Sequence, residues 1–234
     1  MSMDSSYPGN ELEIFSNCTN WKKYWVSLVA KYIDSQFRII ELGSGIGSNF
    51  PHLKSISQDY FGIEPDSNLV SIATSNHPDA NFMVGLISST FELVKEKKVA
   101  LLYIDVLEHI KDDFNELNQA SSILKIGDFL IVVVPAHQYL FSPFDKAVGH
   151  HRRYSKKQLQ SAMLIGMELR YLKEIDFIGY LAAMINSKLT FRENASLFPV
   201  RIWDFLIPLS KIFDNLFGIL PGKSIVSVWE KTNV

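Results

Sequence analysis

Short apolar runs alternate with amphipathic segments along the chain. Apolar runs that lack a regular polar alternation are typical of strands buried on both faces of a parallel sheet. The sequence predicts seven strands, at residues 37–42, 60–64, 80–85, 99–107, 128–136, 168–177 and 222–231. Because helical patterns separate most of these runs, we expect an α/β fold, with a doubly wound, mostly parallel seven-stranded sheet and helices on both faces.

The first helical pattern covers residues 19–35. Its apolar face consists of Trp21, Trp25, Leu28, Val29 and Tyr32, and its polar face of Lys22, Lys23, Ser27 and Lys31. We expect Thr19 or Asn20 to cap this helix. The helix should pack on the core as part of an N-terminal helical segment, residues 1–36, and its aromatic end could help to close a pocket.

Three further helices are predicted by their end signals, at residues 65–76, 112–127 and 154–167. Asp66 or Ser67 can cap the first of them. Ser155 and Gln158 have the spacing of a capping box at the start of the third.

A very apolar segment, residues 178–222, precedes the last predicted strand. It should form a helical cap over the edge of the sheet, although a dimer surface or a lipid-facing patch is also open. Pro199, Pro208 and Pro221 are expected to divide it into short helices.

Composition narrows the class of protein without choosing a function. The chain has 234 residues, 47% of them hydrophobic, a formal net charge of −2 and one cysteine, Cys18. This balance gives no overall field that would attract nucleic acid. A lone cysteine fits a reducing compartment, and no basic region followed by an apolar run marks the first residues. We therefore expect a cytoplasmic protein without a transmembrane segment.

The stretch "RIIELGSGIGSNF", residues 38–50, ends the first strand with a glycine-rich turn. Such turns allow a ligand to approach the backbone closely. A nucleoside triphosphatase needs a lysine after the loop, and none follows here. A dinucleotide site expects a third glycine where this chain has Ser48. S-adenosylmethionine carries a sulfonium and no phosphate, so a carboxylate at Glu41 favours it over a pyrophosphate.

The string "ELGSGIGSNF" resembles the E-x-G-x-G-x-G signature of class I S-adenosylmethionine-dependent methyltransferases. The segment "YIDVLEHI" at the end of the fourth strand is similar to a common form of that region in small-molecule methyltransferases. The resemblance covers nearly the whole chain and implies a single methyltransferase domain, residues 1–234. It also implies that S-adenosylmethionine is the cofactor and S-adenosylhomocysteine the product.

The resemblance assigns cofactor-binding positions to several strand ends. They are Glu41, Gly43, Ser44, Gly45 and Gly47 in the first turn, Glu64 and Pro65 after the second strand, Leu86 and Ile87 after the third, and Asp105, Val106 and His109 after the fourth. An acid at Glu64 can accept hydrogen bonds from both ribose hydroxyls, which would suit a dinucleotide enzyme equally well. The acid that family members often carry after the third strand is absent here.

The loop after the fifth strand, "PAHQYLFSPFDKAVGHHRRYSKKQL", should cover the reacting methyl group, because ligands bind beyond the carboxyl ends of such strands. His150 or His151 could act as the base, with Asp145 as its orienter or as an alternative base. The predicted substrate-binding residues are Tyr139, Arg152, Arg153 and Tyr154. Both arginines could instead pair with acids and hold the loop. No metal-ligand spacing is recognisable.

Our first hypothesis is methyl transfer to a small-molecule acceptor at oxygen, by in-line displacement. The basic residues of the loop suggest an anionic acceptor, and a lipid-linked acceptor is also open. The alternatives are an NAD(P)-dependent oxidoreductase and a non-catalytic cofactor-binding scaffold. A homodimer through the apolar C-terminal helices is a further option.

Overall fold

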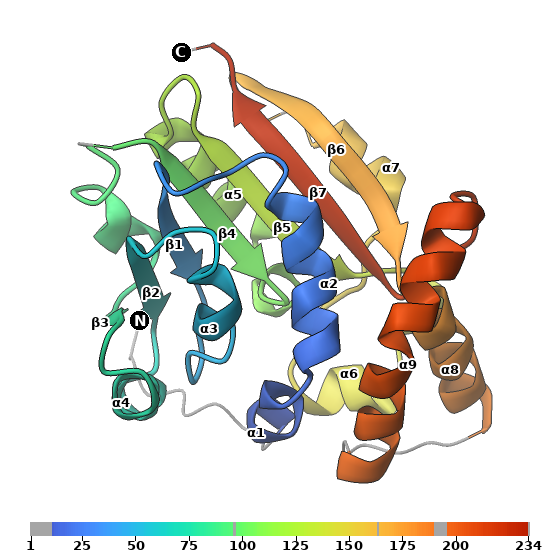
Figure 1. Ribbon diagram of the computed structural model, residues 1–234. Coiled ribbons are helices and arrows are strands. Elements are labelled where there is room, and N and C mark those ends of the chain that lie inside the picture. The colour runs from blue at the N-terminus through green and yellow to red at the C-terminus, as the bar shows by residue number, and fades with distance from the viewer. Residues whose placement is uncertain (1–10, 96, 163, 190–195, 234) are drawn as a thin grey trace.

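The computed structural model describes residues 11–95, 97–162, 164–189 and 196–233. Its centre is a seven-stranded sheet in the order β3-β2-β1-β4-β5-β7-β6 (Figure 1). The strands are β1 (Arg38–Leu42), β2 (Tyr60–Glu64), β3 (Asn81–Val84), β4 (Val99–Ile104), β5 (Phe129–Pro135), β6 (Met167–Ile175) and β7 (Ser224–Lys231). The seven predicted strands are therefore confirmed.

The sheet is mostly parallel. β1 pairs in parallel with both β2 and β4, and β4 with β5, whereas β7 runs antiparallel to its neighbours β5 and β6. The chain proceeds outward from β1 to β3, then returns to β4 on the other side of β1. The carboxyl ends of β1 and β4 thus form a topological switch point, the place where open α/β sheets bind ligands.

Helices cover both faces of the sheet, as predicted. They are α1 (Glu11–Ser16), α2 (Thr19–Val29), α3 (Phe50–Leu53), α4 (Ser67–Asn76), α5 (Asp113–Ile123), α6 (Pro143–Ala147), α7 (Lys156–Ser161), α8 (Phe177–Leu189) and α9 (Leu197–Leu216), with short 3-10 turns at Ile87–Thr90, Leu107–His109 and Gln138–Leu140. In Figure 1, α2 and α9 lie in front of the sheet, and α5 and α7 lie behind it. Ile39 and Ile40, neighbours in β1, belong to the two separate cores that result.

The start of α2 is capped by a residue far away in the sequence. Neither Thr19 nor Asn20 caps it, so that prediction is wrong. The Asp204 carboxylate of α9 instead accepts hydrogen bonds from the backbone N–H groups of Asn20, at 3.2 Å, and Trp21, at 2.9 Å. The predicted cap at Asp66 is confirmed, as is the capping box of Ser155 and Gln158.

The predicted division of the apolar segment into short helices is wrong, because α9 continues through Pro199 and Pro208. Pro199 lies in the first turn, where backbone N–H groups have no helical partner. Pro208 deprives the carbonyl of Asp204 of its helical hydrogen bond. The Asn20 side chain supplies the missing donor, since its Nδ2 lies 3.1 Å from that carbonyl.

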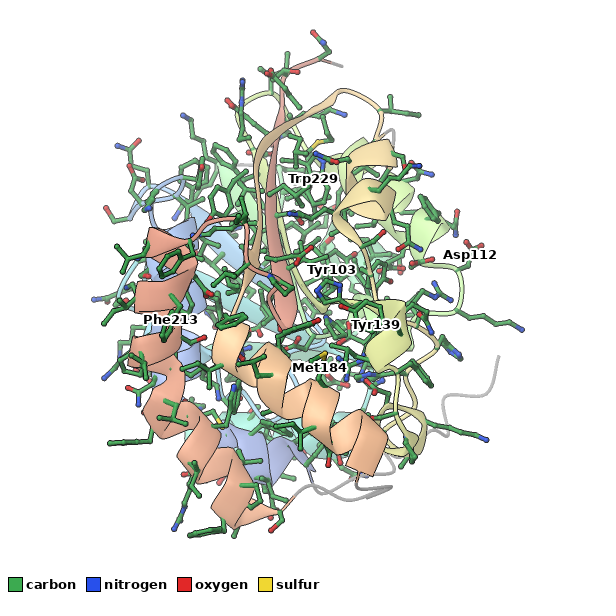
Figure 2. All side chains as sticks on the ribbon, turned by 90° about the vertical axis from the view of Figure 1, so that its right-hand side faces the viewer. Tyr103, Asp112, Tyr139, Met184, Phe213 and Trp229 are labelled. Carbon is green, nitrogen blue, oxygen red and sulfur yellow. The ribbon has the colours of Figure 1, made fainter. Side chains whose placement is uncertain are left out.

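The polar side of α9 faces inward. Asp204, Ser210 and Asp214 are buried, and Asp214 accepts hydrogen bonds from the Tyr24 hydroxyl and from the N–H of Asp176. The outer side exposes large apolar side chains: Phe198, Ile202, Phe205, Leu209, Ile212 and Leu216. Figure 2 shows α9 beside α8, with both inserted before β7 as the sequence predicts. Part of the predicted cap, 190–195, and residues 1–10 of the N-terminal segment lie outside the described residues.

Each helix in the described ranges is too short or too polar for a bilayer span.

Replacing Asp204 with alanine should lower the free energy of unfolding by about 0.5–2 kcal/mol, the range for loss of a helix N-cap. Two N–H groups at the start of α2 would lose their acceptor. Urea unfolding measures the change. Arg201→Ala, on an exposed position of the same helix, is the matched control and should stay within about 0.5 kcal/mol of the parent. Equal losses in both variants would contradict the capping role.

Candidate functional site

The glycine turn after β1 has a backbone that only glycine adopts readily. Gly43, Gly45 and Gly47 have φ angles of +69°, +52° and +77°. A Cβ at Gly43 would lie 2.5 Å from a methyl of Val106, and one at Gly47 would lie 2.7 Å from the ring of Phe82. A Cβ at Gly45 would meet only Leu12, at 3.6 Å. Gly43 and Gly47 therefore shape the turn, whereas Gly45 leaves open space for a ligand.

Two cavities meet at this turn, beyond the carboxyl ends of β1 and β4. We name one the β2 cavity; it is lined by Leu12, Leu42, Gly43, Gly45, Ile63, Glu64, Pro65, Leu69, Gly85, Leu86, Ile87, Tyr103, Asp105, Val106, His109, Ile110 and Glu116. The other, the aromatic cavity, is lined among others by Phe15, Trp21, Trp25, Ser44, Phe144 and Trp203. Both include Leu12, Gly43, Gly45, Asp105 and His109. A ligand in one cavity would therefore lie next to a ligand in the other.

The β2 cavity contains most of the predicted cofactor positions. Glu64 is buried, and its carboxylate accepts hydrogen bonds from the N–H of Gly45, at 3.0 Å, and of Asp66, at 3.1 Å. Burial raises its pKa. Two polar lining residues, Tyr103 and Glu116, were not predicted. The Tyr103 hydroxyl donates to the Glu116 carboxylate at 2.9 Å. Neither carries a local motif, because Glu116 lies within an ordinary amphipathic helix.

Glu41, on which the sequence argument for a cationic ligand depends, lines neither cavity. It is 1% exposed, and its carboxylate accepts hydrogen bonds from Asn49 Nδ2 and the Tyr60 hydroxyl, both at 2.6 Å. Burial raises its pKa to about 7. Direct attraction between Glu41 and a ligand is thus not supported by the geometry. The residue instead ties the glycine turn to α3 and β2.

The sequence argument expected Glu41 to be the acid beside the ligand, but in the structure Asp105 is the acid that lines both cavities. It directly follows β4 and has a φ of +54°. Burial raises its pKa, opposed by the charges of Lys223 and His150. His109 also lines both cavities. Burial, together with His150 and His151, lowers its pKa to about 4, so this imidazole is neutral at physiological pH.

Two lysines of the aromatic cavity were not predicted. Lys22, assigned to the polar face of its helix, is 4% exposed and its ammonium donates to the carbonyls of Phe15 and Ser16, at the end of α1. The ammonium of Lys223 lies 3.7 Å from the centre of the Trp203 ring. Burial lowers the pKa of both lysines. The cavity therefore combines aromatic walls with two cationic groups.

The loop after β5 is organised around Asp145. This carboxylate is fully buried and accepts hydrogen bonds from Arg153 Nε and Nη2, each at 2.9 Å. It also accepts from the N–H and hydroxyl of Ser142. Although burial opposes it, these contacts and His150 hold the pKa of Asp145 well below its usual range. These contacts make Asp145 the anchor of the loop after β5.

Asp145 also orients His150. The two are joined by Nδ1 and Oδ1 at 3.0 Å. Because the carboxylate of Asp145 is an acceptor, Nδ1 donates to it, and Nε2 is left on the far side of the ring. His150 lines the aromatic cavity. Of the two predicted histidine bases, only His150 reaches the cavity, since His151 is exposed and lines neither one.

Three of the four predicted substrate-binding residues lie outside both cavities. Arg152 forms an ion pair with Asp113 and donates to the Lys111 carbonyl at 2.7 Å. Tyr154 is buried and its hydroxyl donates to Asp113 at 2.6 Å. Tyr139 is exposed and its hydroxyl lies 3.1 Å from that of Tyr180. Arg153 alone of the four lines the aromatic cavity, with its guanidinium bound to Asp145.

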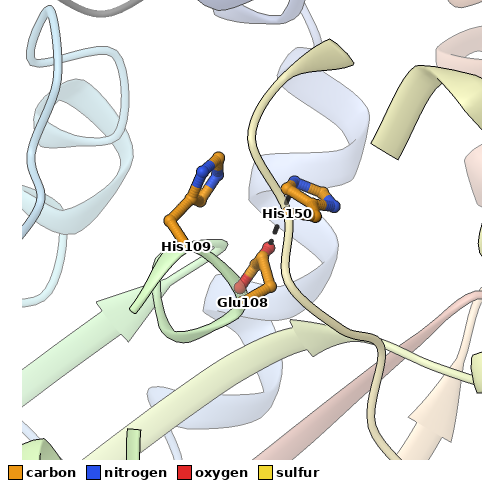
Figure 3. Close-up of side chains that lie close together, drawn as sticks. All are labelled: Glu108, His109 and His150. Atoms are coloured by element: carbon orange, nitrogen blue, oxygen red, sulfur yellow. Dashed lines mark ion pairs between the residues drawn. The ribbon is translucent and has the colours of Figure 1, made fainter. Parts of the chain in front are cut away.

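Glu108 is the functional candidate that the sequence prediction missed. It follows Asp105 by one turn and lies in the same cavity wall as His109 and His150 (Figure 3). Its Oε1 is 3.9 Å from His150 Nε2. In the sequence, only its position next to His109 could have marked Glu108 as a site residue. Its other neighbour, His150, comes from a distant loop.

Comparison with known proteins was made with the sequence and with the structure. No family model and no curated protein matches the sequence significantly. Coclaurine N-methyltransferase, solved with N-methylheliamine and S-adenosylhomocysteine, superposes with a TM-score of 0.60 and 11% identity over 97% of this chain and 83% of that one. An S-adenosylmethionine-dependent methyltransferase of Archaeoglobus fulgidus gives 0.59 and 11%, over 94% and 97% of the two chains.

A third relative, a methyltransferase of Thermotoga maritima described as a possible histamine N-methyltransferase, gives a TM-score of 0.57 and 19% identity over 95% of each chain. The chain has the methyltransferase fold. At these identities the similarity establishes the architecture, and the prediction of a methyltransferase-type α/β fold is confirmed.

The raised pKa of Glu41 predicts a pH-dependent stability. The folded chain holds this proton up to about pH 7, whereas the unfolded chain releases it near the ordinary value of 4.5. The folded state thus binds more protons between these values, so its stability falls as pH rises through this window. Glu41→Gln cannot ionise. Its unfolding free energy relative to the parent should rise by a few kcal/mol from pH 4.5 to 7.5, at about 1.4 kcal/mol per pKa unit.

Urea unfolding at several pH values measures this difference. Parallel pH dependence in the two chains would contradict the assignment to Glu41.

Proposed function

We propose that this protein is an S-adenosylmethionine-dependent methyltransferase that acts on a small-molecule oxygen acceptor. The observation that carries the proposal is the pair of adjoining cavities at the switch point of a methyltransferase fold, with Gly45 and Asp105 at their junction. One cavity suits a nucleoside and the other an aromatic-lined acceptor site. The junction is where a transferable methyl group would lie.

The cofactor would occupy the β2 cavity. Glu64 would accept hydrogen bonds from the ribose hydroxyls, and Pro65, Leu86 and Ile87 would pack against the adenine. The carboxylate of Asp105 would lie near the cationic end of the cofactor. Two unlike charges about 4 Å apart attract by about 4 kcal/mol at an effective dielectric of 20, before desolvation. This arrangement replaces Glu41 with Asp105 in the electrostatic argument.

The acceptor would occupy the aromatic cavity. Trp21, Trp25 and Trp203 offer flat apolar surfaces, and Lys22 and Lys223 offer positive charge. Burial lowers the pKa of both lysines, and an anionic group beside them would raise it again. These features support an acceptor with an apolar body and an anionic group. The exposed apolar face of α9, the helix that contributes Trp203 to the cavity, is compatible with a lipid-linked acceptor.

Methyl transfer is an in-line displacement at the sulfonium carbon. Holding the acceptor oxygen about 3–3.5 Å from the methyl group supplies most of the rate enhancement. A hydroxyl acceptor must also lose a proton, and Nε2 of His150, which lines this cavity, is the nitrogen that would accept it. Asp145 keeps the opposite nitrogen protonated and stabilises the imidazolium that forms. Asp145 is a positioning residue in this scheme.

Calorimetric titration with S-adenosylhomocysteine tests the cofactor assignment, with NAD as the competing ligand. The parent should bind S-adenosylhomocysteine and not NAD. Glu64→Ala should bind it at least about tenfold more weakly, because each ribose hydrogen bond to a charged group contributes roughly 1.5–3 kcal/mol. Preference for NAD would indicate an oxidoreductase, and binding without turnover on any acceptor would indicate a scaffold.

A screen of hydroxyl-bearing aromatic acids, read by release of S-adenosylhomocysteine, should identify an acceptor. With that acceptor, His150→Asn should lower kcat by about 10²–10⁴-fold, the usual range for loss of a general base. His151→Asn, an exposed neighbour, is the matched control and should retain parent activity. Full activity in His150→Asn would exclude the base role.

A further inference from the structure

Glu108 has an unusual environment for a buried acid. It is 1% exposed, and among the described residues neither of its carboxylate oxygens has a hydrogen-bond donor. A buried carboxyl group without a hydrogen-bond donor costs free energy unless a ligand or ion partners it. Because the side chain lines the aromatic cavity, its partner can enter from that side.

Two imidazoles lie beside this carboxylate. Ligand atoms of Glu108, His109 and His150 all lie within 4.8 Å of one another, the only such group of three in the described part of the chain. Figure 3 shows His109 and Glu108 rising from the turn after β4, with His150 approaching from the loop after β5. Around one ion at about 2.0–2.2 Å, such atoms stand roughly 3–3.5 Å apart. Side-chain rotations that move these atoms by about 1 Å would bring all three within bonding distance of one ion.

The hydrogen bond between His150 and Asp145 is what a ligating histidine requires. Metal-bound imidazoles generally donate their second N–H to a carboxylate, which fixes the tautomer and directs the other nitrogen to the ion. Nδ1 of His150 is bound to Asp145 at 3.0 Å, and Nε2 points towards Glu108. Asp145 is itself held by Arg153, so the orientation of this imidazole is fixed before any ion arrives.

We propose that Glu108, His109 and His150 bind a divalent transition-metal ion, of which Zn²⁺ is the type, at the wall of the aromatic cavity. Two imidazoles and one carboxylate suit Zn²⁺ better than Mg²⁺ or Ca²⁺. The remaining coordination positions face the cavity, where an acceptor oxygen or water would fill them. This last point rests on the proposed function, whereas ion binding itself does not.

The ion would change the role of His150. Once its Nε2 lone pair binds the ion, the imidazole cannot also accept a proton. The ion would instead lower the pKa of a bound hydroxyl, whose proton would pass to solvent water. Asp105, which lines the same cavity, adds negative charge near the ion.

Calorimetric titration of the full chain, freed of metals by a chelator, tests the site with Zn²⁺ and Mg²⁺. The parent should bind one Zn²⁺ per chain at micromolar concentration and Mg²⁺ more weakly. Glu108→Gln and His150→Asn should each reduce the affinity for Zn²⁺ by more than about tenfold. His151→Asn removes an exposed histidine one position away and should bind as the parent does.

S-adenosylhomocysteine titration of every variant shows that it is folded, and His109→Gln is the second test if Glu108→Gln fails this check. Absence of a one-to-one Zn²⁺ site in the parent would overturn the proposal. So would an equal loss in His151→Asn, or unchanged binding in Glu108→Gln and His150→Asn. If Zn²⁺ fails while S-adenosylhomocysteine binds, only the metal site is lost. The reverse result would leave the metal site and remove the proposed function.

Discussion

The buried ion pair between Asp145 and Arg153 is the interaction on which the site depends. Removing one partner of such a pair usually costs about 3–5 kcal/mol, because the other charge is left buried and unpaired. Besides stabilising the fold, this pair organises the loop after β5. Ser142, at the start of α6, and His150, at its far end, bind the same carboxylate. The ion pair thus fixes both ends of the segment that closes the aromatic cavity.

The opposite wall of the cavity depends on α9. Its carboxylates bind the start of α2 through Asp204, and Tyr24 through Asp214. These contacts fix α2, and therefore place Trp21 and Trp25 against the ligand space. Because α9 turns its polar residues inward, its apolar face stays exposed to solvent. The large apolar side chains that it exposes are the consequence of using its polar residues as caps for other elements.

Local signals predicted the fold, and they also predicted several residues that line the β2 cavity. Apolar runs give buried strands, and the three glycines of the turn adopt the positive φ angles that glycine favours. At Gly43 and Gly47 a Cβ atom would also clash with a neighbouring side chain. Glu64 and Asp105 could be located because residues at the ends of parallel strands gather at one edge. These inferences need only the neighbouring residues and the order of the strands.

The acceptor side could not be predicted in the same way, because charged residues acquire their roles from distant partners. Arg152 and Tyr154 look like substrate ligands in the sequence, yet Asp113 of another element binds both. The sequence predicts a solvated Lys22, yet its ammonium binds a carbonyl at the end of α1. Pro208 reads as a helix breaker, and Asn20 of α2 removes that effect by binding the freed carbonyl. In each case the role of the residue depends on a contact with another element, which neighbouring residues in the sequence do not reveal.

Backbone strain marks the same edge of the sheet. Asp105, His137 and Asp176 have φ angles of +54°, +65° and +71°, and each lies just beyond the carboxyl end of its strand. Such conformations cost roughly 1–3 kcal/mol each and persist where surrounding contacts impose them. The contacts are present: the N–H groups of these residues donate to Val133, Tyr154 and Asp214, at 2.8, 2.7 and 2.6 Å. The chain therefore turns sharply at this edge. After β4, this turn places the carboxylate of Asp105 at the junction of the two cavities.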